Sequence, residues 1–312
     1  MRCALITGCR GFIGRHLARR ISQEGYTVVG IGHGAWTQRD HLAWGVAEWC
    51  NADVTRTNLE AVAGGTRRIE VVFHLAGGSS VGPSLNLPAE DFRRSVGSTL
   101  EVLEWCRNRS ERPAVVLASS AAIYGDQYSR PVHVDDPGHP KSPYGHHKLM
   151  SEQLVRSYAE SFGVHASIVR LFSVYGPELR KQLLWDACQK LRTTPGALTL
   201  AGTGQELRDW LHVADAAEIL HHASGCASRE CTVTHGATGV PVSVREIGDA
   251  LCAAFGGRHR GASFTGQVRP GDPGTLVSHP DDVPKVGPLR PWRTGVAEYV
   301  AWFLQECERG TS

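Results

Sequence analysis

The chain begins with an apolar run, a glycine-rich turn and a helical pattern, and few folds accommodate this order. Residues 3–7 are short and apolar, which predicts a buried parallel strand. The segment Gly8-Cys-Arg-Gly11-Phe-Ile-Gly14 follows, and apolar residues then recur at helical spacing up to Ile21. Glycines in such a turn let the backbone approach a pyrophosphate, and the helix N-terminus attracts the anion. The turn therefore predicts a dinucleotide site whose expected contacts are Gly8, Arg10, Gly11, Phe12, Ile13 and Gly14.

Strand and helix patterns continue to alternate beyond this turn. A second β-rich apolar run at 26–31 follows the first helical pattern, which ends at Glu24-Gly25. Further strands are expected at 69–75, 114–119 and 166–172, and helices at 88–108 and 143–162. The alternation predicts an α/β fold with a Rossmann-type, doubly wound parallel sheet.

The elements become shorter after Tyr175-Gly-Pro177. Helical patterns are expected there at 181–192, 213–223, 244–255 and 296–306. We interpret this part as a smaller, partly interleaved C-terminal α/β domain. The expected division assigns 1–172 plus 208–235 to the dinucleotide-binding domain and 173–207 plus 236–312 to the substrate domain.

Charge and cysteine usage exclude several classes of function. The 312 residues carry 33 Lys and Arg against 31 Asp and Glu, so a net charge of +2 provides no field to attract nucleic acid or an anionic membrane. The nine cysteines are scattered without a C-x-x-C pair, which fits reduced thiols in the cytoplasm. Adjacent histidines occur at 146–147 and 221–222, but their side chains diverge on a helix, so we expect no metal site. No apolar stretch reaches the roughly 18 residues of a membrane span.

A tyrosine and a lysine share one face at the start of the helix expected at 143–162. Ser142 is suited to cap the helix and Pro143 to its first position, which places Tyr144 in the first turn and Lys148 four residues later. An ammonium group beside Tyr144 would lower the phenol pKa from about 10 and make Tyr144 a general base. An ordinary surface pair on a helix is the alternative.

Hydroxyl side chains end the strand expected at 114–119. In Leu117-Ala-Ser119-Ser120-Ala-Ala-Ile-Tyr124-Gly125, a buried strand delivers Ser119 and Ser120 to the carboxyl edge of the sheet. Ligands of open α/β sheets bind at this edge. Partners for Tyr144 and Lys148 are therefore expected there.

Taken as an ordered set, these motifs resemble the extended short-chain dehydrogenase/reductase family, in its NAD(P)-dependent nucleotide-sugar epimerase/dehydratase branch. The resemblance covers nearly the whole chain. It is carried by Thr7-Gly8-x-x-Gly11-Phe-Ile-Gly14, His74-Leu-Ala, Ser119-Ser-Ala-Ala-Ile-Tyr-Gly125, Tyr144-x-x-x-Lys148, Arg170-Leu-Phe-Ser-Val-Tyr-Gly-Pro177 and Arg208-Asp209.

The resemblance implies roles for individual residues. Tyr144 is the expected catalytic acid/base, Lys148 is expected to hold the nicotinamide ribose, and Ser120 is expected to hydrogen-bond the reacting sugar hydroxyl. Further cofactor contacts are expected from Asp53, Val54, Leu75 and Ala76. Substrate contacts are expected from Ser79, Ser80, Ser120, Ser173, Arg208, Arg269 and Asp272, and Ser84 is expected to line the sugar side of the cleft.

Two departures from the family pattern bear on the reaction. Ala121 and Ala122 stand where dehydratase members generally carry acidic residues, which favours an epimerase over a dehydratase. The second strand ends without the carboxylate that accepts hydrogen bonds from the adenosine ribose of NAD. Arg10 and His33 are instead available to a 2′-phosphate, so both NAD and NADP stay open as the cofactor.

The expected function is C4 epimerisation of a nucleoside-diphosphate hexose through a transient 4-keto intermediate. The alternatives are an NADPH-dependent 4-keto nucleotide-sugar reductase and a non-catalytic NADP-binding sensor. The expected partner is the nucleotide sugar, with neither nucleic acid nor membrane. The resemblance also implies a homodimer formed through the helices at 88–108 and 143–162.

Overall fold

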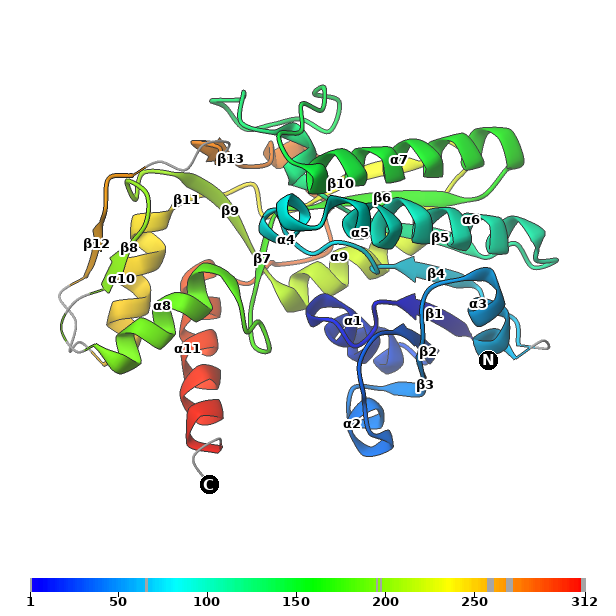
Figure 1. The fold of residues 1–312 in the computed structure, drawn as a ribbon, viewed down its shortest axis with the longest axis horizontal. Coiled ribbons are helices and arrows are strands. Elements are labelled where there is room, and N and C mark those ends of the chain that lie inside the picture. The colour runs from blue at the N-terminus through cyan, green and yellow to red at the C-terminus, as the bar shows by residue number, and fades with distance from the viewer. Residues whose placement is uncertain are drawn as a thin grey trace.

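A seven-stranded parallel sheet forms the centre of the larger of two lobes (Figure 1). The computed structural model describes residues 2–64, 67–194, 196, 198–256, 261–267 and 272–309. The strand order is β10-β6-β5-β4-β1-β2-β3, and each neighbouring pair is parallel. The strands are β1 (Cys3–Thr7), β2 (Thr27–Gly32), β3 (Val46–Asn51), β4 (Val71–His74), β5 (Ala114–Ser120), β6 (Ala166–Leu171) and β10 (Thr232–Gly236). The predicted doubly wound α/β fold is confirmed.

Helices cover both faces of this sheet. One face packs on α1 (Phe12–Gln23) and α9 (Val213–Gly225), and the other packs on α3 (Arg56–Ala63), α6 (Ser98–Asn108) and α7 (Pro143–Phe162). Each central strand is apolar and buried because both of its faces are covered. The remaining elements of this lobe are α2 (Gln38–Ala43), α4 (Val81–Asn86), α5 (Pro88–Phe92) and a short 3₁₀ turn, η2 (Ala121–Tyr124).

Several elements differ from the sequence-based expectation, which did not include the helices α2, α3 and α4. The sequence did not predict β3, an edge strand in which buried and exposed residues mix without a strict period. The helix expected at 88–108 consists of α5, a π-helical turn, η1 (Arg93–Gly97), and α6. Single π turns of this kind are frequent at functional sites.

The order of the sheet reverses between β1 and β4, and a buried hydroxyl–imidazole chain joins the two strands there. Thr7 Oγ1 lies 2.7 Å from His74 Nδ1 and accepts a hydrogen bond from the Ala76 N–H. His74 Nε2 lies 3.1 Å from the Thr99 hydroxyl, which donates to the Ser95 carbonyl. The ends of β1, β4 and α6 are therefore held together where a doubly wound sheet binds its ligand.

The smaller lobe has its own apolar core, built on α8 (Gln182–Thr193), α10 (Val244–Ala254) and α11 (Trp292–Arg309). In its four-stranded sheet, β9 (Leu207–His212) pairs in parallel with β7 (Ser173–Tyr175) and β13 (Thr275–Leu276), and antiparallel with β11 (Pro241–Ser243). A second, two-stranded sheet joins β8 (Leu198–Leu200) and β12 (Ala262–Phe264), and a 3₁₀ turn, η3, spans Pro280–Asp282.

The expected domain division remains a prediction. In its favour, α9 and β10 return to the large lobe after the first part of the small one. However, β9 hydrogen-bonds within the small sheet, although the division places 208–212 with the large lobe.

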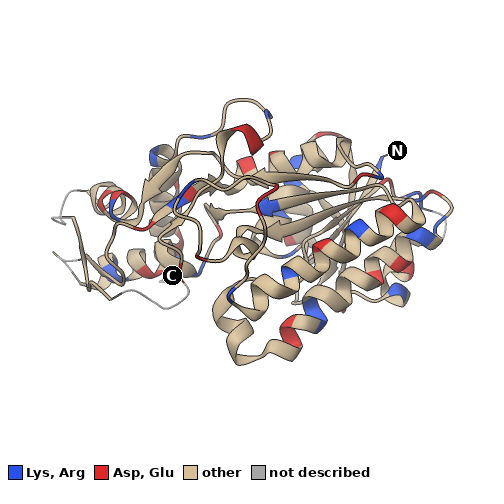
Figure 2. Ribbon diagram, turned by 90° about the horizontal axis from the view of Figure 1, so that it is seen from above, with Lys and Arg blue, Asp and Glu red and all other residues tan. Residues whose placement is uncertain are grey.

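Basic and acidic positions are interspersed along the described helices (Figure 2). This distribution fits the small net charge of +2. Among the described residues, no helix combines the length and apolar character that crossing a bilayer requires.

The close contact between the glycine turn and α1 leads to a stability prediction. A Cβ on Gly14 would lie 2.8 Å from Cys9 Cα and closer still to the Gly8 carbonyl oxygen, and both are backbone atoms. Gly14→Ala should therefore lower the free energy of unfolding by about 1–3 kcal/mol, measured by denaturant titration. Gly225→Ala is the matched control, because Gly225 lies in α9 with open space around its Cα, and it should leave the protein as stable or slightly more stable. Equal losses from both variants would contradict this account.

Candidate active site

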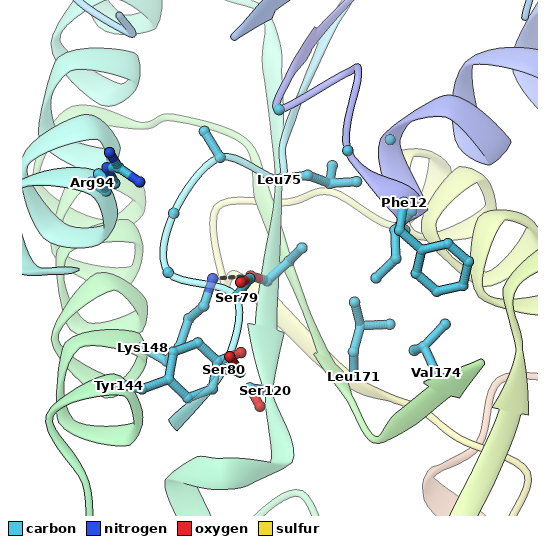
Figure 3. A pocket seen from close by; sticks show the side chains of 18 of the residues that line it. Phe12, Leu75, Ser79, Ser80, Arg94, Ser120, Tyr144, Lys148, Leu171 and Val174 are labelled. Carbon is cyan, nitrogen blue, oxygen red and sulfur yellow. Dashed lines mark hydrogen bonds between the residues drawn. The ribbon is translucent and has the colours of Figure 1, made fainter. Parts of the chain in front are cut away.

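A cavity of 1390 Å³ lies at the carboxyl edge of the large sheet and extends to the small lobe. Its floor includes the glycine turn, the ends of β4 and β5 and the first turn of α7, and its far wall includes α8 and β9. Figure 3 shows Leu75, Ser120, Tyr144 and Lys148 around this cavity. The structure thus brings together motifs that are far apart in the sequence.

The glycine turn forms a cradle without side chains. Gly8 has a positive φ of 69°, and a Cβ there would lie 2.9 Å from the Ala76 nitrogen. Gly11 is the N-cap of α1 and has no side chain to accept hydrogen bonds from the first N–H groups of the helix. These features fit a pyrophosphate bound against the backbone. The expected cofactor contacts Gly8, Arg10, Gly11, Phe12, Ile13, Gly14, Leu75 and Ala76 all line the cavity.

Polar residues that could distinguish NAD from NADP lie at one end of the cavity. His33 Nε2 lies 3.1 Å from Asp53 Oδ1, and both side chains are largely exposed. A Cβ on Gly34 would lie 3.0 Å from Arg10 Cζ, so the guanidinium lies beside the chain that follows β2. Arg10, His33, Asp53 and Val54 line one end of the cavity wall.

The start of α7 positions Tyr144 and Lys148. The Ser142 hydroxyl accepts the Gly145 N–H at 3.2 Å and Pro143 occupies the first turn, as the sequence predicts. The Ser120 hydroxyl accepts the Ala122 N–H at 3.1 Å, and it lies near the Tyr144 phenol, whose pKa it lowers. Lys148 Nζ lies 5.9 Å from the Tyr144 ring centroid and donates to the Ala118 carbonyl at 3.0 Å (Figure 3). Hydroxyl, phenol and ammonium therefore converge on one region of the cavity.

The expected lowering of the Tyr144 pKa by Lys148 is wrong. Burial raises the Tyr144 pKa, and the Ser120 hydroxyl only partly offsets this increase. Burial also lowers the Lys148 pKa to about 8. Since each group is deprived of water, its neutral form is favoured.

A buried ion pair supports the site from below. The Arg170 guanidinium donates to Glu152 at 2.9 Å, and the Ser119 hydroxyl donates to the same carboxylate at 2.5 Å. Arg170 also donates to the Tyr124 phenol at 2.7 Å, and Tyr124 lies 2.6 Å from His235 Nε2. The hydroxyl of Ser119 is therefore held by the Glu152 carboxylate. Ser120 is the strand-end residue whose hydroxyl lies beside Tyr144.

The serines expected on the sugar side separate into two groups. Ser79, Ser80 and Ser173 line the cavity. Ser84 does not; it is fully buried, accepts the Tyr144 N–H at 3.1 Å and donates to the Val81 carbonyl. The prediction for Ser84 is therefore wrong, because α4 turns its hydroxyl under the first turn of α7.

The small lobe contributes charge to the far wall. Arg208 Nη2 donates to Asp272 at 2.7 Å, and both residues line the cavity as well as an adjoining one of 530 Å³. Arg269 lies outside the described residues. The sequence analysis missed Lys181 and Gln182 as lining residues. Lys181 precedes α8 and lines the larger cavity, and Gln182 begins α8 and lines both cavities. A signal was present, because Lys181 closely follows Tyr175-Gly-Pro177.

One group of potential metal ligands occurs among the described residues, and it lies apart from this cavity. His133, His279 and Asp282 bring their ligand atoms within 4.8 Å of one another. The two imidazoles stack at 3.8 Å, and His133 Nδ1 lies 3.0 Å from Asp282 Oδ2. Stacked rings do not aim their nitrogen lone pairs at a common point, so the contacts account for the cluster without an ion.

Comparison with known proteins agrees with this geometry. The model of the NAD dependent epimerase/dehydratase family matches residues 4–228. A UDP-glucose 4-epimerase of Azospirillum brasilense is 30% identical over 302 residues, which cover 89% of this chain and 84% of that protein. A CDP-paratose 2-epimerase of Salmonella typhi is 29% identical, with 72% and 75% covered.

Solved structures show the same similarity. MoeE5 in complex with UDP-glucuronic acid and NAD superposes with a TM-score of 0.82 at 28% identity, covering 97% of this chain and 99% of that one. The resemblance read from the motifs is confirmed. The chain is an enzyme of the NAD dependent epimerase/dehydratase family.

Proposed function

We propose that this enzyme is a nucleotide-sugar 4-epimerase that oxidises and re-reduces C4 of a nucleoside-diphosphate hexose. The observation that carries the proposal is the convergence of Ser120, Tyr144 and Lys148 in one cavity, between a glycine cradle and a cationic wall. Relatives named UDP-glucose 4-epimerase, and solved neighbours bound to UDP-sugars and NAD, support this class of substrate. Ala121 and Ala122, which follow Ser120, supply no carboxylate for a dehydration.

The chain's own residues account for binding. The backbone cradle from Gly8 to Gly14 suits the pyrophosphate of a nicotinamide dinucleotide, and Lys148 is placed to hold its ribose. A bound nicotinamide dinucleotide would supply reversible hydride transfer. Arg208 and Lys181 lie on the opposite wall, where cations suit the diphosphate of the substrate.

Tyr144 handles the proton in both directions. As the C4 hydroxyl is oxidised, the phenolate accepts its proton, and the Ser120 hydroxyl donates a hydrogen bond to the reacting oxygen. While the 4-keto sugar turns, Arg208 and Lys181 keep the diphosphate in place. Reduction on the opposite face, with the proton returned from Tyr144, gives the C4 epimer. No net oxidation occurs, so a retained cofactor suffices.

A second candidate function is an NADPH-dependent 4-keto nucleotide-sugar reductase. It is favoured by the Arg10 guanidinium beside Gly34 and by the absence of a carboxylate at the end of β2. The pairing of His33 with Asp53 weighs against it, because a carboxylate there repels a 2′-phosphate. A sensor without catalysis has no use for Ser120, Tyr144 and Lys148 together.

The homodimer is also a proposal. Large apolar side chains are exposed on the helices that the family resemblance assigns to the interface: Phe92, Leu100 and Met150. They lie on α5, α6 and α7. A second copy of the chain would remove this apolar surface from water.

The proposal predicts a specific defect for Tyr144→Phe. Loss of the phenol removes the proton carrier, so kcat should fall by about 10²–10⁴-fold while the cofactor stays bound, as measured by epimer formation and by cofactor content. Tyr128→Phe is the matched control, because its hydroxyl donates to the Pro137 carbonyl at an exposed position outside the cavity. Near-normal turnover by Tyr144→Phe would refute the role of Tyr144.

The cofactor can be read directly from the purified protein. A self-recycling epimerase should retain its dinucleotide, so denaturing protein prepared without added nucleotide should release near-stoichiometric NAD, identified by mass spectrometry. A site that is empty or holds NADP would favour the reductase and direct the next assay to NADPH consumption.

A further inference from the structure

A buried ion pair that the proposed reaction does not use lies beside the Tyr144–Lys148 pair. His147 Nδ1 lies 2.6 Å from Asp91 Oδ2, and the two side chains are 11% and 6% exposed. The Phe92 ring packs edge-on against the imidazole at 5.4 Å between centroids. An apolar contact on one side and burial on both make this pair a fixed part of the site rather than a surface contact.

The pair connects three parts of the cavity wall. His147 is on α7, three residues after Tyr144, so these two residues lie on the same side of the helix. Asp91 is on α5, and its carboxylate lies directly against the Gly78 backbone, since a Cβ on Gly78 would come 2.8 Å from Asp91 Cγ.

Gly78 belongs to the turn after β4 that lines the cavity. Its N–H donates at 2.9 Å to the Ser95 hydroxyl of the π turn, so the backbone there is held from two sides. The Asp91 carboxylate therefore fills the space between this turn and α7. A change in its charge would alter the electrostatic potential at this part of the cavity wall.

We propose that Asp91, anchored by His147, is a positioning residue that seats the Gly77–Gly78 turn against α7 and places a fixed negative charge beside Tyr144 and Lys148. The inference rests on the proposed function, in which Tyr144 is the general base. The negative charge of Asp91 favours the charged form of Lys148, and it also disfavours the phenolate form of Tyr144.

The electrostatics agree with this geometry. Burial is the main cause that raises the pKa of Tyr144 and lowers that of Lys148, and the Asp91 charge raises both. Among the other charged groups near these residues, Glu152 is paired with Arg170. Asp91, in contrast to Glu152, has an imidazole and not a guanidinium as its described partner.

The neighbouring titratable groups do not cancel this charge. On the elements around Asp91, Glu90 pairs with Arg93 and Arg94 at the exposed side of α5 and η1. His74, across from Lys148, is fully buried, and burial lowers its pKa to about 3, so it stays neutral. The charge of Asp91 therefore acts on Lys148 and Tyr144.

The sign of the effect gives a test. The phenolate form of Tyr144 is lost as the pH falls through the Tyr144 pKa, which produces the acidic limb of kcat/KM. Removing the Asp91 charge lowers that pKa. The isosteric Asp91→Asn variant should therefore shift the acidic limb to lower pH by about one unit.

His147→Asn is the matched control, because its side-chain amide offers an N–H donor near the position of Nδ1 and leaves the Asp91 charge in place. This variant should leave the limb in place or move it to higher pH. If the pair only stabilised the fold, both variants would have a lower melting temperature and an unchanged acidic limb of kcat/KM. That result would overturn the proposal. A shift to lower pH in both variants would overturn it as well.

A readout without substrate separates this inference from the proposed function. The ultraviolet absorbance of tyrosinate is titrated in the holoenzyme and in its Tyr144→Phe variant, so the difference reports Tyr144 alone. The same difference is then measured in the Asp91→Asn background, where its midpoint should fall by about one unit. An unchanged midpoint would overturn the role of Asp91 even if the enzyme proves to be a 4-epimerase. A lowered midpoint in a protein without epimerase activity would leave that role intact.

Discussion

The structure depends on the close approach of three backbone segments where the order of the sheet reverses. Gly8 lies against the Ala76 backbone, Gly14 lies against Gly8 and Cys9, and Thr7 reaches across to the segment after β4. Any side chain at these glycines would separate β1, α1 and β4. Because they meet, the N-terminus of α1 and the ends of β4 and β5 open into one cavity, and a ligand can lie across both halves of the sheet.

Burial then sets the chemistry of this cavity. Tyr144 and Lys148 are withdrawn from water, which favours the neutral form of each and opposes the charged states that the proposed reaction requires. The surrounding residues act against this tendency in different ways. The Ser120 hydroxyl lowers the pKa of Tyr144, whereas the Asp91 carboxylate raises that of Lys148. The lowered pKa of Lys148, about 8, brings this group close to a change of protonation state, whereas the raised pKa of Tyr144 favours the neutral phenol.

Local patterns predicted the elements that depend on local physics. The glycine turn, the buried strands and the capped start of α7 follow from short stretches of sequence, as does the shared face of Tyr144 and Lys148. Contacts between distant segments were not predictable in this way. His147 and Asp91 are 56 residues apart, and nothing near either residue indicates the other. Similarly, β3 is an edge strand in which buried and exposed residues do not alternate, so its sequence alone does not indicate a strand. The pKa of Tyr144 depends on burial, which no sequence motif reports.

The most direct test of the central claim follows the hydrogen at C4. UDP-glucose, UDP-glucuronic acid and UDP-N-acetylglucosamine, each deuterated at C4, are incubated with the enzyme without added cofactor, and the products are analysed by nuclear magnetic resonance and mass spectrometry. The account predicts a C4 epimer of at least one of them that retains its deuterium, since the hydride leaves and returns within one active site. Failure to form any C4 epimer, or loss of the deuterium, would contradict it.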